Sequence, residues 1–220
     1  MNDNKIKFSP TKAHQRYKMA DGVQVPGVTT VLNVIAKPAL LNWAWECGCK
    51  GEDYRKVRDH AADAGTLGHW LVECHLKRQE PDLSDFAPAV ISLAESAYIK
   101  WLTWWDKSGF ELVSSEAQLV SDTHAYGGTL DILARDRDGN MTLVDLKTSK
   151  AIYEEYWHQV AAYGQLYDEK AEKKITRYII CRIGKETDDA DFEVQERTSV
   201  AKNLAVFNAA LVLYRAMKAK

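Results

Sequence analysis

Apolar side chains recur at helical spacing in two long segments of the first half of the chain. The first segment, 61–77, carries a stripe of three such residues: Leu67, Leu71 and Cys74. The second, 87–107, carries a stripe of three aromatic residues: Tyr98, Trp101 and Trp105. Both patterns predict amphipathic helices. We expect the aromatic stripe to face the core, because large rings at this spacing usually pack inward; the alternative is that the rings stack on unpaired bases.

The second half of the chain alternates apolar and polar residues, which is typical of strands. Strands are predicted over three consecutive segments: 110–120, 126–134 and 141–147. Residues 136–139, Asp-Arg-Asp-Gly, form a turn signal between the last two, so these two strands should be antiparallel. The remaining pattern predicts a helix, two strands and a closing helix: 154–168, 176–183, 191–195 and 199–216. This order predicts an α/β fold in which helices cover a mixed sheet.

With 220 residues, the chain is long enough for one buried core and an accessory layer, so we expect a single domain. Its parts are a basic N-terminal arm (1–24), a helical wall (25–108) in which Pro38 separates two short helices, and a core (109–220). The formal net charge is -2. Any contact with nucleic acid must therefore come from a local basic patch or from bound cations.

Cysteine usage and hydropathy narrow the class of protein further. The four cysteines lack a CxxC pair, which fits reduced thiols better than a disulfide framework or a zinc knuckle. No apolar stretch approaches the roughly 20 residues that a membrane span needs. The polar, basic start also lacks the apolar centre of a secretory signal. We therefore expect a cytoplasmic protein without a membrane partner, in the host cytoplasm if the chain is viral.

Two carboxylates and a lysine should meet on the predicted hairpin. Strand alternation places Asp145 and Lys147 on one face, and the short turn brings Asp131 of the preceding strand opposite Asp145. Converging carboxylates repel unless a cation holds them, and oxygen ligands suit Mg²⁺ or Mn²⁺. The lysine could orient or deprotonate a water and offset charge on a phosphate. Taken alone, the tripeptide 145–147 favours an ordinary surface ion pair over a catalytic site.

Four short motifs in a fixed order add a resemblance to this pattern. They are Gly65-Thr66-Leu67-Gly68-His69, Gly127-Gly128-Thr129-Leu130-Asp131, Val144-Asp145-Leu146-Lys147-Thr148-Ser149 and Gln159-x-x-x-Tyr163. Together they resemble the RecB-like branch of the PD-(D/E)XK nuclease superfamily. The run 114–167 is similar to the mitochondrial genome-maintenance exonucleases and to related phage exonucleases. The resemblance extends over about 25–170.

The resemblance implies a fold and a metal site. The fold is a restriction-endonuclease-like core, a mixed central sheet flanked by helices, with an N-terminal helical layer that forms an arch or wall over the site. The implied metal ligands are the carboxylates of Asp131 and Asp145, the backbone carbonyl of Leu146, and His69. The implied cofactor is Mg²⁺, for which Mn²⁺ can substitute. For His69, the alternative is a half-buried helix histidine without a metal.

The resemblance also assigns the catalytic residues. Lys147 would be the catalytic lysine, while Gln159 and Tyr163, one helical turn apart, would line the site and contact the phosphate or a ligand water. Glu116 lies in the predicted strand that precedes the strand of Asp131, where relatives often carry an acidic residue that backs the site. The chain departs from the pattern in carrying Asp145 in place of the more usual glutamate. No cysteine cluster follows Tyr163, so we expect no iron-sulfur cluster.

The expected function is Mg²⁺-dependent phosphodiester hydrolysis by a deoxyribonuclease. The resemblance favours an exonuclease that acts on DNA ends or single strands in replication, recombination or repair, with a recombination or replication protein as a candidate partner. Two alternatives stay open: a catalytically silent DNA-binding protein of the same fold, and an endonuclease. Products released from ends would indicate an exonuclease, and cutting of closed circles an endonuclease.

Overall fold

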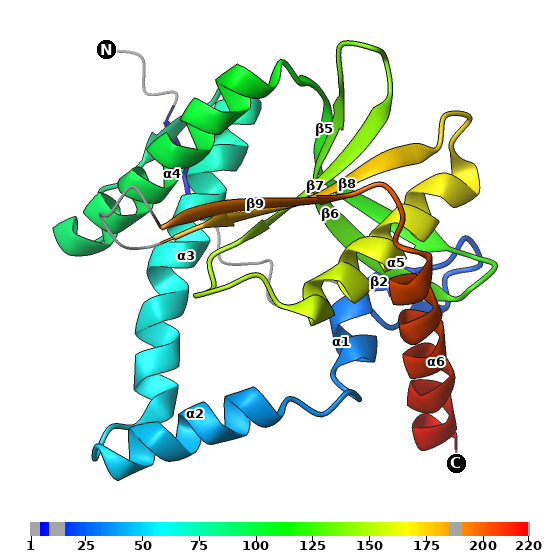
Figure 1. The fold of residues 1–220 in the computed structure, drawn as a ribbon, viewed down its shortest axis with the longest axis horizontal. Coiled ribbons are helices and arrows are strands. Elements are labelled where there is room, and N and C mark those ends of the chain that lie inside the picture. Colours follow the sequence, from blue (N-terminus) through cyan, green and yellow to red (C-terminus); the bar gives the residue numbers. More distant parts are fainter. Residues whose placement is uncertain (1–4, 9–15, 185–190, 220) are drawn as a thin grey trace.

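The computed structural model of the chain is built on a five-stranded mixed sheet in the order β5-β6-β7-β8-β9 (Figure 1). The strands are β5 (Glu111–Ser121), β6 (Tyr126–Arg135), β7 (Met141–Lys147), β8 (Ile175–Ile183) and β9 (Phe192–Arg197). The first three form an antiparallel meander, β8 is parallel to β7, and β9 is antiparallel to β8. The structure describes residues 5–8, 16–184 and 191–219, with only the backbone described at 39 and 58–64.

Helices cover both faces of this sheet, as the sequence pattern predicted. One face packs against α1, α5 and α6, and the other against α3 and α4. The helix α2 connects α1 to α3 and stands away from the sheet (Figure 1). The helices are α1 (Val28–Leu32), α2 (Pro38–Cys49), α3 (Tyr54–Leu76), α4 (Pro88–Ser108), α5 (Glu154–Lys170) and α6 (Ala201–Lys218). The crossover that a parallel strand pair requires, between β7 and β8, is α5.

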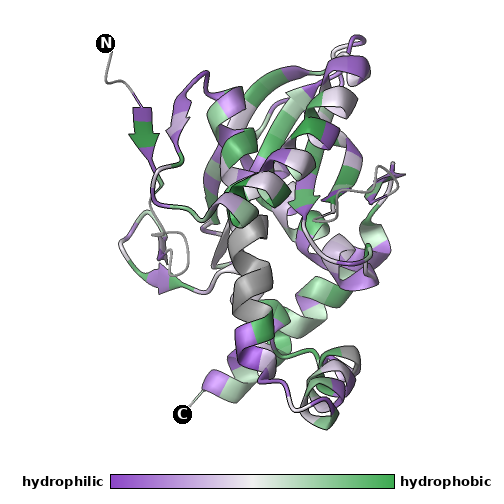
Figure 2. Cartoon of the chain, turned by 90° about the vertical axis from the view of Figure 1, so that its left-hand side faces the viewer, coloured by the Kyte–Doolittle hydropathy of each residue, from purple (hydrophilic) through white to green (hydrophobic). Residues whose placement is uncertain are grey.

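The central strand β7 shows how the sheet is buried on both sides. Leu143 belongs to the cluster beneath α5 and α6, whereas Val144 and Leu146 belong to the cluster beneath α3 and α4. Hydrophobic colour accordingly follows the strands in Figure 2, while the turns at the edge are hydrophilic. The alternation predicted for this strand is confirmed, and it sends Asp145 and Lys147 toward the α5 side.

The aromatic stripe of α4 is core, as predicted. Trp101 is fully buried and Trp105 nearly so. Their rings stack with centroids 5.3 Å apart. These two tryptophan rings are therefore not exposed for stacking on bases.

The helix α3 begins earlier than the predicted 61, because Asp53 caps it: the side chain accepts a hydrogen bond of 2.9 Å from the backbone N–H of Arg55.

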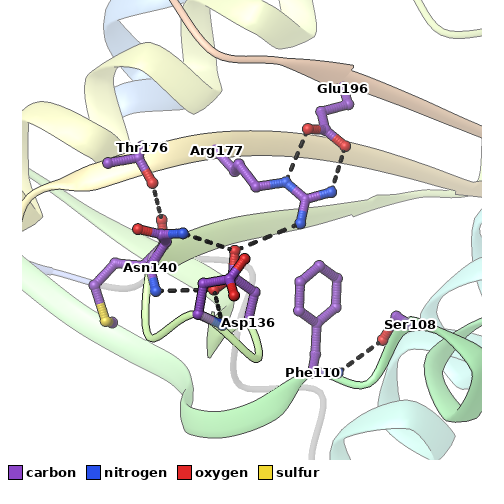
Figure 3. A network of polar contacts seen from close by, with 9 residues as sticks. Ser108, Phe110, Asp136, Asn140, Thr176, Arg177 and Glu196 are labelled. Atoms are coloured by element: carbon purple, nitrogen blue, oxygen red, sulfur yellow. Dashed lines mark hydrogen bonds and ion pairs between the residues drawn. The ribbon is translucent and has the colours of Figure 1, made fainter.

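The predicted turn between β6 and β7 is held by Asp136 (Figure 3). Its carboxylate accepts hydrogen bonds from the backbone N–H groups of Asp138 and Asn140, at 3.0 and 2.9 Å, and from the side-chain amide of Asn140. Arg177 of β8 lies 3.8 Å from the same carboxylate and forms two hydrogen bonds, 2.8 and 2.6 Å long, with Glu196 of β9. This network joins β6–β9 at the end of the sheet where β7 begins.

Strand pairing ties the first described part of the N-terminal arm to the body of the protein, because β1 (Lys5–Lys7) is parallel to β4 (Glu80–Asp82). Further along, β2 (Tyr17–Lys18) and β3 (Gln24–Val25) form a short antiparallel hairpin. Residues 1–4 and 9–15 of the predicted arm lie outside the described residues. Within the described part of the chain, no helix is both long and apolar enough to cross a bilayer.

The structure pairs none of the four cysteines in a disulfide. Three of them, Cys47, Cys74 and Cys181, are buried, whereas Cys49 is exposed. Cys49 differs because it lies at the end of α2, the helix that stands away from the sheet.

Candidate active site

The candidate site lies where β6 and β7 separate. Their paired residues end with Ile132 and Val144, one position short of Asp131 and Asp145. The register therefore places these two carboxylates opposite each other, as predicted, but the backbones do not pair there. Instead, the carboxylate of Asp131 accepts a hydrogen bond of 2.8 Å from the backbone N–H of Leu146. The separation opens a gap between two strands that are otherwise buried on both sides.

Asp145 is a buried carboxylate that is ion-paired with Lys147 through Oδ2. Its side chain is about 1% exposed, and among the residues that the structure describes its oxygens have no further hydrogen-bond partner. Burial raises its pKa to about 6, against the opposing charge of Lys147 and with the help of Asp131. Burial also disfavours the charge of Lys147, but Asp145 and Asp131 outweigh it and raise the lysine pKa. Buried polar groups in proteins are usually hydrogen-bonded, and a bound cation would supply the partner that this carboxylate lacks.

A small cavity opens on the α3 side of this gap. It has a volume of about 10 Å³ and is lined by residues that include His69, Glu73, Glu116, Asp131 and Leu146. His69 projects from α3, and its positive form lowers the pKa of Asp145, so the histidine lies within electrostatic reach of that carboxylate. Glu73 is ion-paired with Lys77 at 2.6 Å. The structure thus places His69, Glu116, Asp131 and Leu146, which the sequence assigned to one site, around one cavity.

These residues fit a hard divalent cation in chemistry, although they are not arranged as a finished ligand set. The carboxylates of Asp131 and Asp145 are oxygen ligands of the kind that Mg²⁺ and Mn²⁺ prefer, and within the described residues Asp145 has no partner beyond its ion pair with Lys147. Within the described residues, no three His, Cys, Asp or Glu side chains already surround one point as metal ligands. One reason is visible: Asp131 is turned toward Leu146, and Lys147 holds Asp145.

Glu116 carries an unusual backbone conformation. Its φ is 52°, in the left-handed region, in the middle of β5. The ladder between β5 and β6 skips it: Ser115 pairs with Ile132 and Ala117 with Leu130, which leaves Glu116 facing Asp131. For a residue other than glycine this conformation costs on the order of 1–2 kcal/mol. Strain of this kind concentrates at functional sites, and here it turns a carboxylate toward the cavity.

The α5 side of the site carries the predicted pair Gln159 and Tyr163. The Gln159 amide donates a hydrogen bond of 2.7 Å to the Tyr163 hydroxyl. Burial first, and then the charge of Asp145, hold the pKa of Tyr163 well above its ordinary value. Gly128 makes room for this ring, because a Cβ atom built on it would lie 2.5 Å from the Tyr163 ring. The glycine of the sequence motif thus has a packing role.

Two residues of the site escaped the sequence pattern. Tyr17 of β2 lies across Gly127, where a Cβ atom would approach its ring to 2.5 Å, and its hydroxyl is 3.0 Å from the Thr129 hydroxyl. Tyr156 of α5 places its ring 5.1 Å from the Lys147 ammonium. The paired glycines could have indicated a ring packed against the strand, but not which ring. Nothing in the helical pattern distinguishes Tyr156.

Comparison with known proteins gives remote structural likenesses only. No protein-family model matches the chain, and no curated protein matches it. A putative exonuclease from Eubacterium rectale is 10% identical with a TM-score of 0.47, and the match covers 70% of this chain and 65% of that one. An alkaline exonuclease from Laribacter hongkongensis is 12% identical with a TM-score of 0.38, over 72% of this chain and 90% of that one. The chain thus spans less than two thirds of the Eubacterium rectale protein.

Proposed function

We propose that this chain is a Mg²⁺-dependent nuclease of the PD-(D/E)XK type that hydrolyses phosphodiester bonds in DNA. The observation that carries the proposal is Asp145: a carboxylate buried beside Lys147 and Asp131 at the point where two strands part, which within the described residues has no hydrogen-bond partner beyond its ion pair with Lys147. A structural ion pair has no need of a second carboxylate and an orphaned oxygen. A hydrolytic metal site needs both.

Asp131 and Asp145 would hold the metal, with His69 and the Leu146 carbonyl as further ligands. When bound, Mg²⁺ would supply Lewis-acid stabilisation of the charge that develops on the phosphate. Glu116, turned toward the same cavity, would back the metal site with a further negative charge. Mn²⁺ would substitute, since a histidine nitrogen is an acceptable ligand for it.

The protein's own residues would handle the phosphate and the water. Lys147 keeps its charge because Asp145 and Asp131 raise its pKa, so its ammonium would orient the attacking water and offset negative charge on the phosphate. Tyr163 keeps its proton because burial raises its pKa. Since its hydroxyl already accepts from Gln159, its own proton is free to be donated to a phosphate oxygen. The water oxygen would bond to phosphorus as the phosphorus–oxygen bond to the leaving nucleotide breaks; the attacking water would lose one proton to solvent, and the leaving oxygen would take one from solvent.

We further propose an exonuclease that acts on DNA ends or single strands, in the cytoplasm, during replication, recombination or repair. The helices α1, α2 and α3 run around the side of the molecule on which β7 ends and α5 begins (Figure 1). Lys37, in the link between α1 and α2, lies 3.6 Å from Glu155 in the first turn of α5. This helical wall would pass a strand toward the site, and a replication or recombination protein would deliver the DNA.

The test compares linear and closed circular DNA. Wild-type protein with Mg²⁺ should release mononucleotides or short oligomers from end-labelled linear DNA and leave closed circles intact. Lys147→Ala and Asp145→Ala should abolish the release while circular dichroism shows a folded protein. Undiminished cleavage by either variant would overturn the site assignment, and cutting of closed circles would show an endonuclease.

A further inference from the structure

Two tyrosines stand next to each other at the beginning of α5, beside Lys147. The Tyr156 ring lies 5.1 Å from the Lys147 ammonium. The Tyr153 ring meets it edge-on, with centroids 5.6 Å apart and an interplanar angle of 75°. Tyr156 is half-buried and packs against the main core, whereas Tyr153 is 43% exposed. Together they present an aromatic surface that runs from the candidate catalytic lysine to solvent.

Helix stability gives no reason for a tyrosine at position 153. Tyr153 is the N-cap residue of α5, in extended conformation, and its side chain makes no capping hydrogen bond. Serine, threonine, aspartate or asparagine is strongly preferred at this position because each caps a helix. Tyr153 also contributes little core packing, since nearly half of it faces solvent. The ring is thus available to contact a ligand beside the site, a role for which tyrosine, with its apolar ring and polar tip, is well suited.

The charges around the pair suit a nucleic-acid strand. The two acidic residues in the first turn of α5 are both paired with cations: Glu154 with Arg197 at 2.8 Å and Glu155 with Lys37 at 3.6 Å. Lys150, in the loop between β7 and α5, is exposed. A strand whose phosphate lies at Lys147 would thus meet one further cation, Lys150, and the two glutamates beside it are already ion-paired.

From this arrangement we infer that Tyr153 and Tyr156 form a stacking platform for an unpaired base next to the cleaved phosphate. The inference rests on the proposed nuclease function. The platform would give that site its preference for single strands. Aromatic rings stack on any base, but only where the base face is free. In a duplex that face is covered by the neighbouring base pair. Lys147 would contact the backbone and Tyr153 the base of the same nucleotide, while Tyr156, packed between them, fixes the position of the Tyr153 ring.

The test measures binding without cleavage, by fluorescence anisotropy of a labelled single-stranded oligonucleotide in EDTA. Tyr153→Ala should raise the Kd about tenfold, in the range of one lost stacking contact. Tyr153→Phe, which keeps the ring, should bind as wild type does. The same oligonucleotide with abasic sites should bind wild type and Tyr153→Ala equally. Tyr167→Ala, near the other end of α5, is the matched control and should leave the Kd unchanged.

Duplex binding and cleavage complete the test. Tyr153→Ala should leave the Kd for a blunt duplex unchanged, and with Mg²⁺ it should raise KM on single strands without a comparable fall in kcat. Unchanged single-strand binding by Tyr153→Ala, or equal losses on single strands and duplex, would overturn the platform. Failure of the proposed function is distinguishable, because it would appear as wild-type protein that cleaves no DNA with Mg²⁺ whatever the anisotropy shows.

Discussion

Two aspartates at opposite ends of the same strand pair, Asp136 and Asp145, differ in how the fold satisfies a carboxylate. Asp136 receives hydrogen bonds from two backbone N–H groups and one side-chain amide, and these bonds lower its pKa (Figure 3). Among the described residues, Asp145 has no partner beyond its ion pair with Lys147, and burial raises its pKa. The fold satisfies the first carboxylate, and we propose that a cation satisfies the second. Four variants test this contrast, from the largest expected effect to the smallest.

Asp145→Asn removes the charge of the unsatisfied carboxylate at nearly constant volume. We expect hydrolysis of end-labelled DNA to fall roughly a hundred- to a thousandfold, because charge stabilisation at the phosphate depends on this residue. Wild-type protein should also melt at a higher temperature when Mg²⁺ is added, since a bound cation stabilises the folded state. Asp145→Asn should lose that rise. A variant that keeps both the activity and the Mg²⁺-induced rise would refute the metal role of Asp145.

Gly128→Ala should disturb the site through Tyr163. The added Cβ would lie 2.5 Å from the ring, so the tyrosine must move. We expect a stability loss of about 1–3 kcal/mol, typical of overpacking, and a fall in kcat of about tenfold. Gly48→Ala is the control, because nothing lies within 4 Å of its Cβ position. Chemical denaturation and steady-state rates measure the two effects, and unaltered kcat in Gly128→Ala would contradict a role for Tyr163.

Asp136→Ala should lower stability and leave activity unchanged, whereas Asp145→Asn should mainly lower activity. Removing the three hydrogen bonds of this carboxylate should lower the melting temperature by a few degrees, because the turn and Arg177 lose their anchor. The rate per folded molecule should not change. Differential scanning calorimetry and activity at a temperature well below melting test both halves. A large loss of activity without a loss of stability would erase the contrast between the two aspartates.

Glu154→Gln tests a third carboxylate, one that joins α5 to β9 and α6. Hydrogen bonds from Arg197 and Asn203 lower the pKa of Glu154 from 4.5 to about 2. A carboxylate with a lowered folded-state pKa stabilises the fold above its unfolded pKa, and the contribution disappears as pH falls through the folded pKa. Because this side chain is largely exposed, we expect Glu154→Gln to cost less than about 1 kcal/mol at pH 7.

The difference in melting temperature between wild type and Glu154→Gln should therefore shrink between pH 4.5 and about 2. Thermal melts of both proteins across that range measure it. A difference that grows as the pH falls would have the wrong sign for this carboxylate.

The sequence predicted the elements of the fold well because they depend on local patterns. The alternation over β7 places Leu143 on one side and Val144 and Leu146 on the other, and the structure confirms it. The aromatic stripe of α4 was likewise predicted to be core, and Trp101 is fully buried. Apolar periodicity of this kind depends only on residues that are close in the sequence, so it can be recognised without knowledge of the rest of the chain.

The parts that escaped prediction depend on residues far apart in the chain. Where β6 parts from β7, Asp131 accepts a hydrogen bond from the Leu146 backbone, and no local sequence pattern predicts that bond. Glu116, with its left-handed backbone, lies opposite that gap. Tyr17 reaches the site from a short hairpin more than a hundred residues away in sequence. The site's outline was therefore predictable, but its geometry was not.

The most direct test of the metal-dependent site at Asp145 is a Mg²⁺ titration of DNA hydrolysis, with end-labelled single-stranded DNA as substrate. Wild-type protein should release labelled product in proportion to metal occupancy, with none in EDTA and recovery when Mg²⁺ is restored. Asp145→Asn should release little product at any Mg²⁺ concentration. Hydrolysis by wild type that persists in EDTA, or hydrolysis by Asp145→Asn at the wild-type rate, would contradict a metal site built on Asp145.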